Sequence, residues 1–184
     1  MFLMIAGLVL FLGAHLVPIA RGTRRMLVAR AGEQRYKGLF SIVSGVGLVL
    51  IIAGYWLGDR GPQVFAPVLA ARRVAPLVVT ITFILFAASH MRGHIRRVLR
   101  HPMTIGVVLW SGVHLLANGD LRGTVLFGSF FAWSLLDLAA SYARRPIEPY
   151  APAVRFDLMA VLGGVLVAGV VMFLHPYLFG VRPY

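Results

Sequence analysis

Long runs without a charged residue constrain this chain more than any other feature. Residues 1–20, 39–58, 74–91, 102–119 and 158–181 contain no Asp, Glu, Lys or Arg, and residues 123–143 contain only Asp137. An α-helix rises about 1.5 Å per residue, so each run is long enough to cross a hydrocarbon core of about 30 Å. The alternating segments of about ten residues that a membrane β-barrel needs are absent. The pattern predicts an all-α integral membrane protein, a bundle of six transmembrane helices.

The composition agrees with a membrane protein. Of the 184 residues, 59% are hydrophobic, 13% are charged and none is cysteine, whereas soluble domains carry about 25% charged residues. A soluble domain, a disordered tail and a disulfide scaffold are therefore excluded. We expect one domain over residues 1–184. Its expected spans are about 2–20, 39–58, 74–91, 102–118, 122–143 and 157–177. The first span lacks a basic start and exceeds the apolar region of a signal peptide, so we expect it to be retained as an anchor.

The 18 basic residues outnumber the six acidic ones and predict the orientation. Thirteen of the 18 fall in segments 21–38, 92–101 and 144–157, which lie on one side of a six-span arrangement. Because cytoplasmic loops are enriched in Lys and Arg, we expect this side in the cytoplasm and both termini outside, in the periplasm. The positive charge thus marks a membrane face, and the partner it indicates is the lipid bilayer, not nucleic acid.

Local patterns predict how the helices meet. Asn118, Gly119 and Asp120 predict a turn in which Asp120 caps the next helix. The prolines in segment 146–152 favour an extended chain. Small residues that would let helices approach closely are Gly47, Gly54, Gly58, Gly163 and Gly164.

The histidines carry most of the functional information. His15 and His114 lie inside the first and fourth spans, where an ionisable group is expensive and is therefore a candidate functional residue. Counted along their helices, their depths differ by about 8 Å in a core of about 30 Å. Two such imidazoles could ligate one iron from opposite sides, as in bis-histidine haem. Four ligands for a structural zinc are lacking. The alternative is that each neutral imidazole only hydrogen-bonds a neighbouring helix.

Other ionisable residues each have two interpretations. His90 and His94, at i and i+4, would share a helical face. We interpret them as an interfacial basic patch with the nearby arginines, and a surface metal site is the alternative. Asp137 is predicted to pair with Arg144 or Arg145 of the next loop. Its alternative role is in a proton relay or in the surroundings of a haem.

Several motifs resemble those of the NnrU-like family of bacterial membrane proteins. The most specific begins with Arg100-His101-Pro102-Met103-Thr104-Ile105-Gly106 and continues through Trp110 to His114-Leu115-Leu116-Ala117-Asn118-Gly119-Asp120. The other matching segments are 38–44, 131–133 with Asp137, and 174–181, which contains His175. No function is predicted for His175 itself.

The resemblance implies a haem protein of the bacterial inner membrane. The family is associated with denitrification, as an accessory to nitrite and nitric oxide reduction. It is also related to 15-cis-ζ-carotene isomerase, a haem b enzyme whose two histidine ligands correspond in position to His15 and His114, the latter 13 residues after His101. The resemblance thus implies haem b with these two axial ligands. The implied partners are nitrogen-oxide reductase machinery or a hydrophobic molecule such as a carotenoid. The isomerase's redox-sensitive cysteine has no counterpart in this chain, so the resemblance does not extend to ligand switching.

Arg100 and His101 complete the predicted cofactor-binding set. Arg100 would reach lipid headgroups, His101 would hold a haem propionate or hydrogen-bond at the interface, and Pro102 would begin a helix. The motif is also similar to one that helps membrane methyltransferases to hold S-adenosylmethionine, although Thr104 replaces its tyrosine and no acidic residue follows Asp157. We therefore expect a haem-binding accessory of nitrogen-oxide reduction. The alternatives are a haem-dependent cis–trans isomerase of a polyene, a non-catalytic assembly subunit and, with least support, a methyltransferase.

Overall fold

The protein is built from helices. The computed structural model describes residues 1–143 and 150–180. Within these ranges the helices are α1 (Phe2–Leu16), α2 (Arg21–Ala31), α3 (Glu33–Leu57), α4 (Leu69–Ser89), α5 (His94–Leu99), α6 (Pro102–Asn118), α7 (Leu121–Tyr142) and α8 (Val154–Phe179). Strand pairing in the described residues is limited to one isolated bridge between Gln63 and Asp120. The predicted all-α fold class is confirmed.

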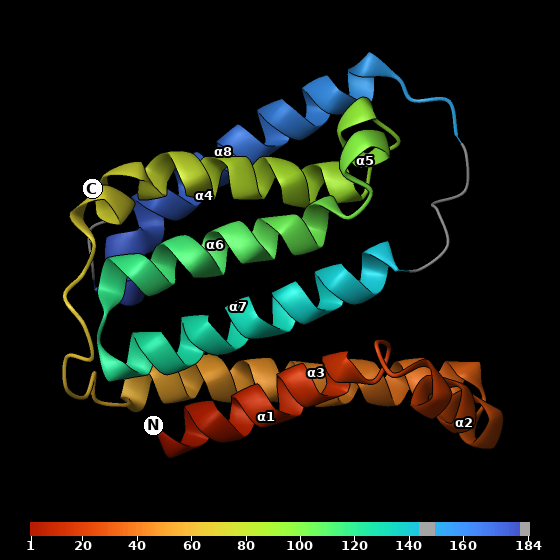
Figure 1. Ribbon diagram of the computed structural model, residues 1–184, viewed down its shortest axis with the longest axis horizontal. Coiled ribbons are helices and arrows are strands. Elements are labelled where there is room, and N and C mark those ends of the chain that lie inside the picture. Colours follow the sequence, from red (N-terminus) through yellow and green to blue (C-terminus); the bar gives the residue numbers. More distant parts are fainter. Residues whose placement is uncertain (144–149, 181–184) are drawn as a thin grey trace.

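The six longer helices lie side by side along the long axis of the molecule (Figure 1). Neighbours form a row in which α8 packs on α4, α4 on α6, α6 on α7 and α7 on α1, which pairs closely with α3. The start of α1 and the end of α8 lie at the same end of the bundle. The other end carries the short helices α2 and α5, whose arginines give it the name used below, the basic end.

Glycines bring the backbones of α1 and α3 into contact. A Cβ atom on Gly47 would stand 2.7 Å from the backbone nitrogen of Phe11, and one on Gly54 would overlap the backbone of Met4. No side chain fits at such distances, so the two helices can approach this closely only because these positions are glycine.

The predicted role of the glycines is confirmed for most of them. A Cβ on Gly58 would meet the backbone nitrogen of Met1 at 2.8 Å, and one on Gly164 would meet the backbone of Ile84 on α4 at 2.5 Å. For Gly163 the prediction is wrong, because a Cβ there would face open space. Gly163 and Gly164 are adjacent in α8, so they point to different sides of the helix and only one can face α4.

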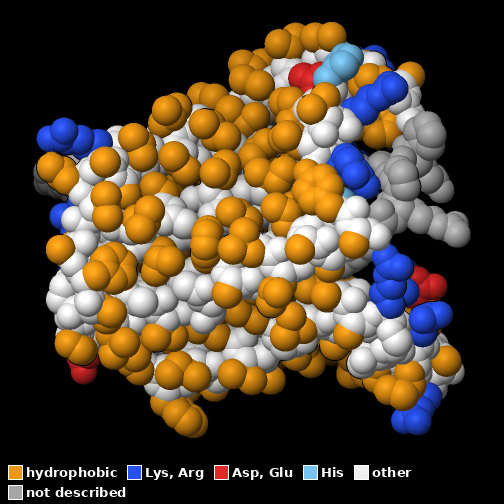
Figure 2. Space-filling model, in the orientation of Figure 1, with side chains coloured by type: hydrophobic (Ala, Val, Ile, Leu, Met, Phe, Trp, Pro, Cys, Tyr) orange, Lys and Arg blue, Asp and Glu red, His pale blue; other side chains and the backbone are white. Residues whose placement is uncertain are grey.

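The hydrophobic core lies where α1, α3 and α7 meet. Its buried side chains are Met4, Leu8, Ile51, Leu126 and Phe127. The outer surface is also apolar: Figure 2 shows hydrophobic side chains over the middle of the molecule, whereas Lys and Arg gather toward its ends, chiefly the basic end. A soluble monomer rarely exposes a contiguous apolar surface of this extent, so this surface fits contact with lipid.

Helix lengths agree with a membrane protein. Within the described residues, α3, α4, α7 and α8 are long and apolar enough to cross a membrane, by length and composition. Helix α1 satisfies the same criteria only together with α2, to which it is bent by 89°, and α6 is shorter, at 17 residues. The fold is therefore that of an all-α membrane protein.

The helices and the uncharged runs do not coincide. Helix α1 ends at Leu16, four residues before its run ends, because Pro18 has no N–H to donate to the carbonyl oxygen four residues earlier in the helix. In contrast, α3 and α4 begin six and five residues before their runs. Arginine, lysine and glutamate are good helix formers, so a helix can continue past the apolar segment into the headgroup region.

Candidate functional site

His15 lies in the last turn of α1, among aromatic rings from three helices. Its Nδ1 is 2.7 Å from the carbonyl oxygen of Phe11, and its ring stacks on the Phe11 ring at 4.3 Å. The rings of Phe40 on α3 and Trp133 on α7 lie 5.0 and 5.6 Å away. A carbonyl oxygen can only accept a hydrogen bond, so Nδ1 carries the proton and the Nε2 atom of a neutral ring keeps its lone pair.

His114, on α6, has the same local geometry. Its Nδ1 is 2.8 Å from the carbonyl oxygen of Trp110, again four residues earlier in the helix. The ring lies 5.4 Å from the Trp110 ring and 4.9 Å from that of Phe127 on α7. Both histidines are half-buried. The two imidazoles therefore come from different helices but present the same nitrogen, Nε2, for bonding to another group.

Aromatic side chains connect the two histidines. The Phe11 ring lies 5.7 Å from that of Phe130 on α7, which lies 5.5 Å from that of Trp110. The path from His15 to His114 thus runs through Phe11, Phe130 and Trp110. On α7, Trp133 contacts His15 and Phe127 contacts His114. These two α7 residues are six positions apart, which is about 9 Å along the helix. The imidazoles are therefore offset along the bundle, with three rings between them.

The donor atoms at this site suit haem iron better than a metal held only by side chains. Among the described residues, no three His, Asp or Glu side chains come together as the ligands of a metal ion. A neutral imidazole whose Nδ1–H is held by a backbone carbonyl is, in contrast, the usual state of a metal-binding histidine. The donor chemistry is of the kind that haem iron takes, but the rings of Phe11, Phe130 and Trp110 stand between the two imidazoles and would have to turn to admit a porphyrin.

Arg100 and His101 lie apart from this aromatic site. His101 precedes α6 and is 13 residues, or about 20 Å, from His114 along the helix. Both side chains lie beside Tyr142 of α7. The Arg100 guanidinium is 5.2 Å from the centre of the tyrosine ring, and the centre of the His101 ring is also 5.2 Å from it. The predicted cofactor-binding set is thus split between the aromatic site and a cluster at the basic end.

The backbone at Arg100 is strained. Its φ is +62° and ψ is −44°, and the N–H of His101 donates a 2.6 Å hydrogen bond to the carbonyl oxygen of Leu99. This three-residue turn has a conformation that non-glycine residues rarely adopt. It ends α5 and allows α6 to begin at Pro102, which confirms the predicted position of this proline in the first turn.

Asp137 connects α7 to α6 near the basic end. Its carboxylate oxygen Oδ2 accepts a 2.9 Å hydrogen bond from the hydroxyl of Thr104. The predicted partners Arg144 and Arg145 lie outside the described residues. Thr104 is the residue at which the chain departs from the methyltransferase motif, and the hydroxyl–carboxylate contact gives it a structural role in this protein.

The predicted pairing of His90 and His94 on one helical face is wrong. His90 follows the last residue of α4, whereas His94 is the first residue of α5. The residues between them include Gly93 in an extended conformation, with φ of −92° and ψ of 177°, which breaks the helix. His94 lies instead beside Asp157 of α8, with 2.7 Å between its Nδ1 and Oδ2 of the carboxylate. No third ligand accompanies this pair in the described residues, so the structure does not support a surface metal site.

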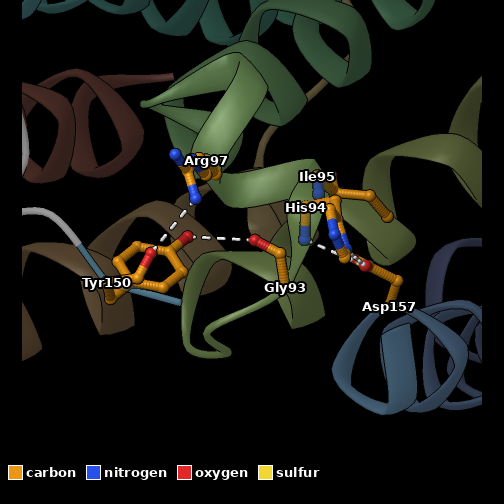
Figure 3. A network of polar contacts seen from close by, with 6 residues as sticks. All are labelled: Gly93, His94, Ile95, Arg97, Tyr150 and Asp157. Atoms are coloured by element: carbon orange, nitrogen blue, oxygen red, sulfur yellow. Dashed lines mark hydrogen bonds and ion pairs between the residues drawn. The ribbon is translucent and has the colours of Figure 1, made fainter. Parts of the chain in front are cut away.

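A network of polar contacts surrounds His94 (Figure 3). The Asp157 carboxylate also accepts hydrogen bonds from the backbone N–H groups of His94 and Ile95, at 2.9 and 3.0 Å. The hydroxyl of Tyr150 donates to the Gly93 carbonyl oxygen at 3.0 Å, and Arg97 donates to the Tyr150 carbonyl oxygen at 3.3 Å. The expected basic patch therefore contains a carboxylate, and it holds α5 against the start of α8.

Arg122 connects α7 to the end of α3, at the end of the bundle opposite the basic end. No sequence pattern predicted a role for this residue. Its Nη1 donates to the carbonyl oxygens of Tyr55 and Gly58, at 2.7 and 2.6 Å, and its guanidinium lies 4.1 Å from the Tyr55 ring centre. The nearby cap is as predicted: the Asp120 carboxylate accepts from the N–H of Gly123 at 2.9 Å. The Arg122 contacts fasten α7 to the end of α3, whereas the Asp120 cap is local to the start of α7.

These features define a multi-helix membrane protein with two imidazoles in an aromatic interior and an arginine-rich end. The family model described as NnrU protein matches residues 3–183, nearly the whole chain. The chain therefore belongs to the NnrU family, which confirms the resemblance predicted from its motifs. Searches of curated proteins and of solved structures found no match.

Proposed function

We propose that this protein binds haem b through His15 and His114. The observation that carries the proposal is the matched state of the two imidazoles. In each, Nδ1 is held by the carbonyl oxygen four residues earlier, which orients the ring and leaves Nε2 to bind iron. Bound haem would supply the one-electron redox chemistry of its iron.

The aromatic residues between the imidazoles have a part in this proposal. Phe11, Phe130 and Trp110 come from α1, α7 and α6 and now fill the space between the histidines. Turned aside, their flat apolar rings would line the faces of a porphyrin and keep water from it. Haem binding is therefore expected to change the packing of Trp110, which intrinsic tryptophan fluorescence can follow.

We further propose six membrane crossings, by α1, α3, α4, α6, α7 and α8, with the basic end in the cytoplasm of a bacterial cell. Support comes from the arrangement in Figure 1, in which the start of α1 and the end of α8 lie at the same end of the bundle, as an even number of crossings requires. The positive-inside rule then places the arginine-rich end inside and both termini in the periplasm.

Family membership supports a role as an accessory to nitrite and nitric oxide reduction, with nitrogen-oxide reductase machinery as the partner. A second candidate is cis–trans isomerisation of a hydrophobic polyene such as 15-cis-ζ-carotene. The observation that favours it is the exposure of the site: both histidines are half-buried among apolar side chains, so a lipid-soluble molecule could reach them from the bilayer.

The optical spectrum of the purified protein tests haem binding. Protein from haem-replete cells should show a Soret band and, when reduced, the spectrum of a low-spin bis-histidine haem. A spectrum without haem would contradict the proposal and leave the imidazoles as packing groups of an assembly subunit. Incubation of the haem-loaded protein with a poly-cis carotenoid, followed by product analysis, distinguishes the isomerase from the redox accessory.

A further inference from the structure

We propose that α2 binds the headgroup of an anionic phospholipid between the side chains of Arg21, Arg24 and Arg25. These three side chains line a shallow hollow of about 340 Å³ on the surface of the molecule. A guanidinium group is planar and can donate two parallel hydrogen bonds to a phosphate, so arginine is well suited to this ligand. The surface is separate from the aromatic site, and the proposal does not depend on haem.

The position of α2 suits contact with headgroups. The helix is bent by 89° from α1, so it lies across the bundle axis at the level where α1 leaves the apolar layer. It packs on α3, and none of its residues is buried. If the bundle axis is normal to the membrane, α2 lies in the plane of the interface, where phospholipid phosphates are found.

The two sides of α2 differ in chemistry. At about 100° per residue, Arg21, Arg24 and Arg25 fall within an arc of about 100° on one side of the helix. Met26 and Leu27 fall on the other side, where Arg30 also lies, whereas Val28 falls among the three arginines. Of the Met26 and Leu27 surfaces, 47% and 36% are exposed. Apolar side chains opposite a basic face are typical of a helix that lies in the interface, with the apolar side toward the acyl chains.

The charge of the three arginines is only slightly offset within the protein: the Glu33 carboxylate at the start of α3 interacts electrostatically with Arg24, but its ion-pair partner is Lys37, at 2.9 Å. Helix α2 contains no acidic residue, and among the described residues no carboxylate lies within 4.0 Å of these guanidinium groups. Arg24 packs over the Tyr36 ring at 5.7 Å, which positions the side chain without neutralising it. Arginines in the first turn also oppose the helix dipole, so they do not serve the stability of α2. A phosphate group would offset both effects.

Native mass spectrometry of the full chain in a mild detergent tests the proposal, with phosphatidylglycerol and phosphatidylcholine as probes. The wild type should bind phosphatidylglycerol in preference to phosphatidylcholine. Each of Arg21→Gln, Arg24→Gln and Arg25→Gln should weaken binding by about fivefold, as expected for the loss of one basic residue near an anionic headgroup. Arg30→Gln is the matched control: it removes the same charge from the same helix, but from the side of Met26 and Leu27. It should leave binding within about twofold of the wild type.

Three results would overturn the proposal. Equal weakening by Arg30→Gln would show a response to net charge and not a site. Equal binding of the two lipids would show that the headgroup charge is not recognised. Displacement of phosphatidylglycerol by an equal concentration of inorganic phosphate would identify a free-phosphate site. Should a glutamine variant fail to fold, Arg24→Lys keeps the charge but loses the planar fork, and should bind more weakly than the wild type.

Discussion

Asp157, in the first turn of α8, accepts hydrogen bonds from both the backbone N–H and the ring Nδ1 of His94, at 2.9 and 2.7 Å. The two residues are 63 positions apart. A carboxylate from one helix therefore caps the N-terminus of another, α5, which has no side-chain cap of its own. Gly93 permits this approach, because a Cβ there would overlap the Asp157 carboxylate.

Removal of this carboxylate should destabilise the basic end. We expect Asp157→Ala to lower the free energy of unfolding by about 1 to 2 kcal/mol, the usual range for loss of an N-cap. His94→Ala is the control: it keeps the backbone hydrogen bonds and removes a ring whose side chain is 51% exposed, so its effect should stay below about 1 kcal/mol. The measurement is unfolding by sodium dodecyl sulfate in mixed micelles. A larger loss for His94→Ala would contradict the capping account.

The contact between α1 and α3 can be tested with two alanine substitutions on the same helix. Gly54→Ala should lower the free energy of unfolding by about 2 to 3 kcal/mol, because the new Cβ would overlap the Met4 backbone and force the helices apart. Gly45→Ala adds the same atom where nothing lies within 4 Å. It should be neutral or stabilise α3 by up to about 1 kcal/mol. The same titration measures both, and similar values for the two would show that the backbone contact is absent.

The strained turn at Arg100 predicts an unusual order of stabilities. Arg100→Gly and Arg100→Ala both remove the guanidinium from the Tyr142 ring, but only glycine adopts a φ of +62° without strain. The glycine variant should therefore be more stable than the alanine variant by about 1 to 2 kcal/mol. Inside a regular helix alanine is the more stable of the two. That usual order at position 100 would show that the turn is not formed.

Arg122 should matter more to stability than other arginines outside the basic end. Arg122→Gln loses the hydrogen bonds to the Tyr55 and Gly58 carbonyl oxygens and the contact with the Tyr55 ring. We expect a loss of about 2 kcal/mol in the free energy of unfolding. Arg73→Gln, a change of the same charge at an exposed position of α4, should stay within about 0.5 kcal/mol. Equal effects would mean that Arg122 does not fasten α7 to α3.

The sequence predicts those helices whose length and apolar composition are required by the hydrocarbon core of a membrane. A hydrocarbon core demands long apolar helices, so the uncharged runs locate most of the long helices. The bend after α1 could not be found this way. Segment 21–31 is rich in arginine and resembles a loop in hydropathy, although arginine, leucine and alanine favour helix. The cap that Asp157 forms on the N-terminus of α5 could not be predicted either, because the residues it joins are distant in sequence.

The site was predictable only in part. Charge-free surroundings mark His15 and His114 as candidates, but they mark His90 and His175 equally, since each of these four histidines lies alone in an uncharged run. The aromatic neighbours of His15 and His114 depend on how α1, α6 and α7 are rotated about their axes, which periodicity does not determine when a helix is apolar on all sides. The motif grouped Arg100 and His101 with His114 in one cofactor-binding set, although the 13 residues between His101 and His114 correspond to about 20 Å of helix.

The account depends most on His15 and His114 as the two ligands of a haem, and difference spectroscopy of single variants tests this directly. Three proteins are compared with the wild type after haem-replete expression: His15→Ala, His114→Ala and the control His90→Ala, which alters an exposed histidine at the end of α4. We predict that each ligand variant loses the low-spin bis-histidine spectrum, while His90→Ala keeps it. An unchanged wild-type spectrum in either His15→Ala or His114→Ala would contradict the assignment.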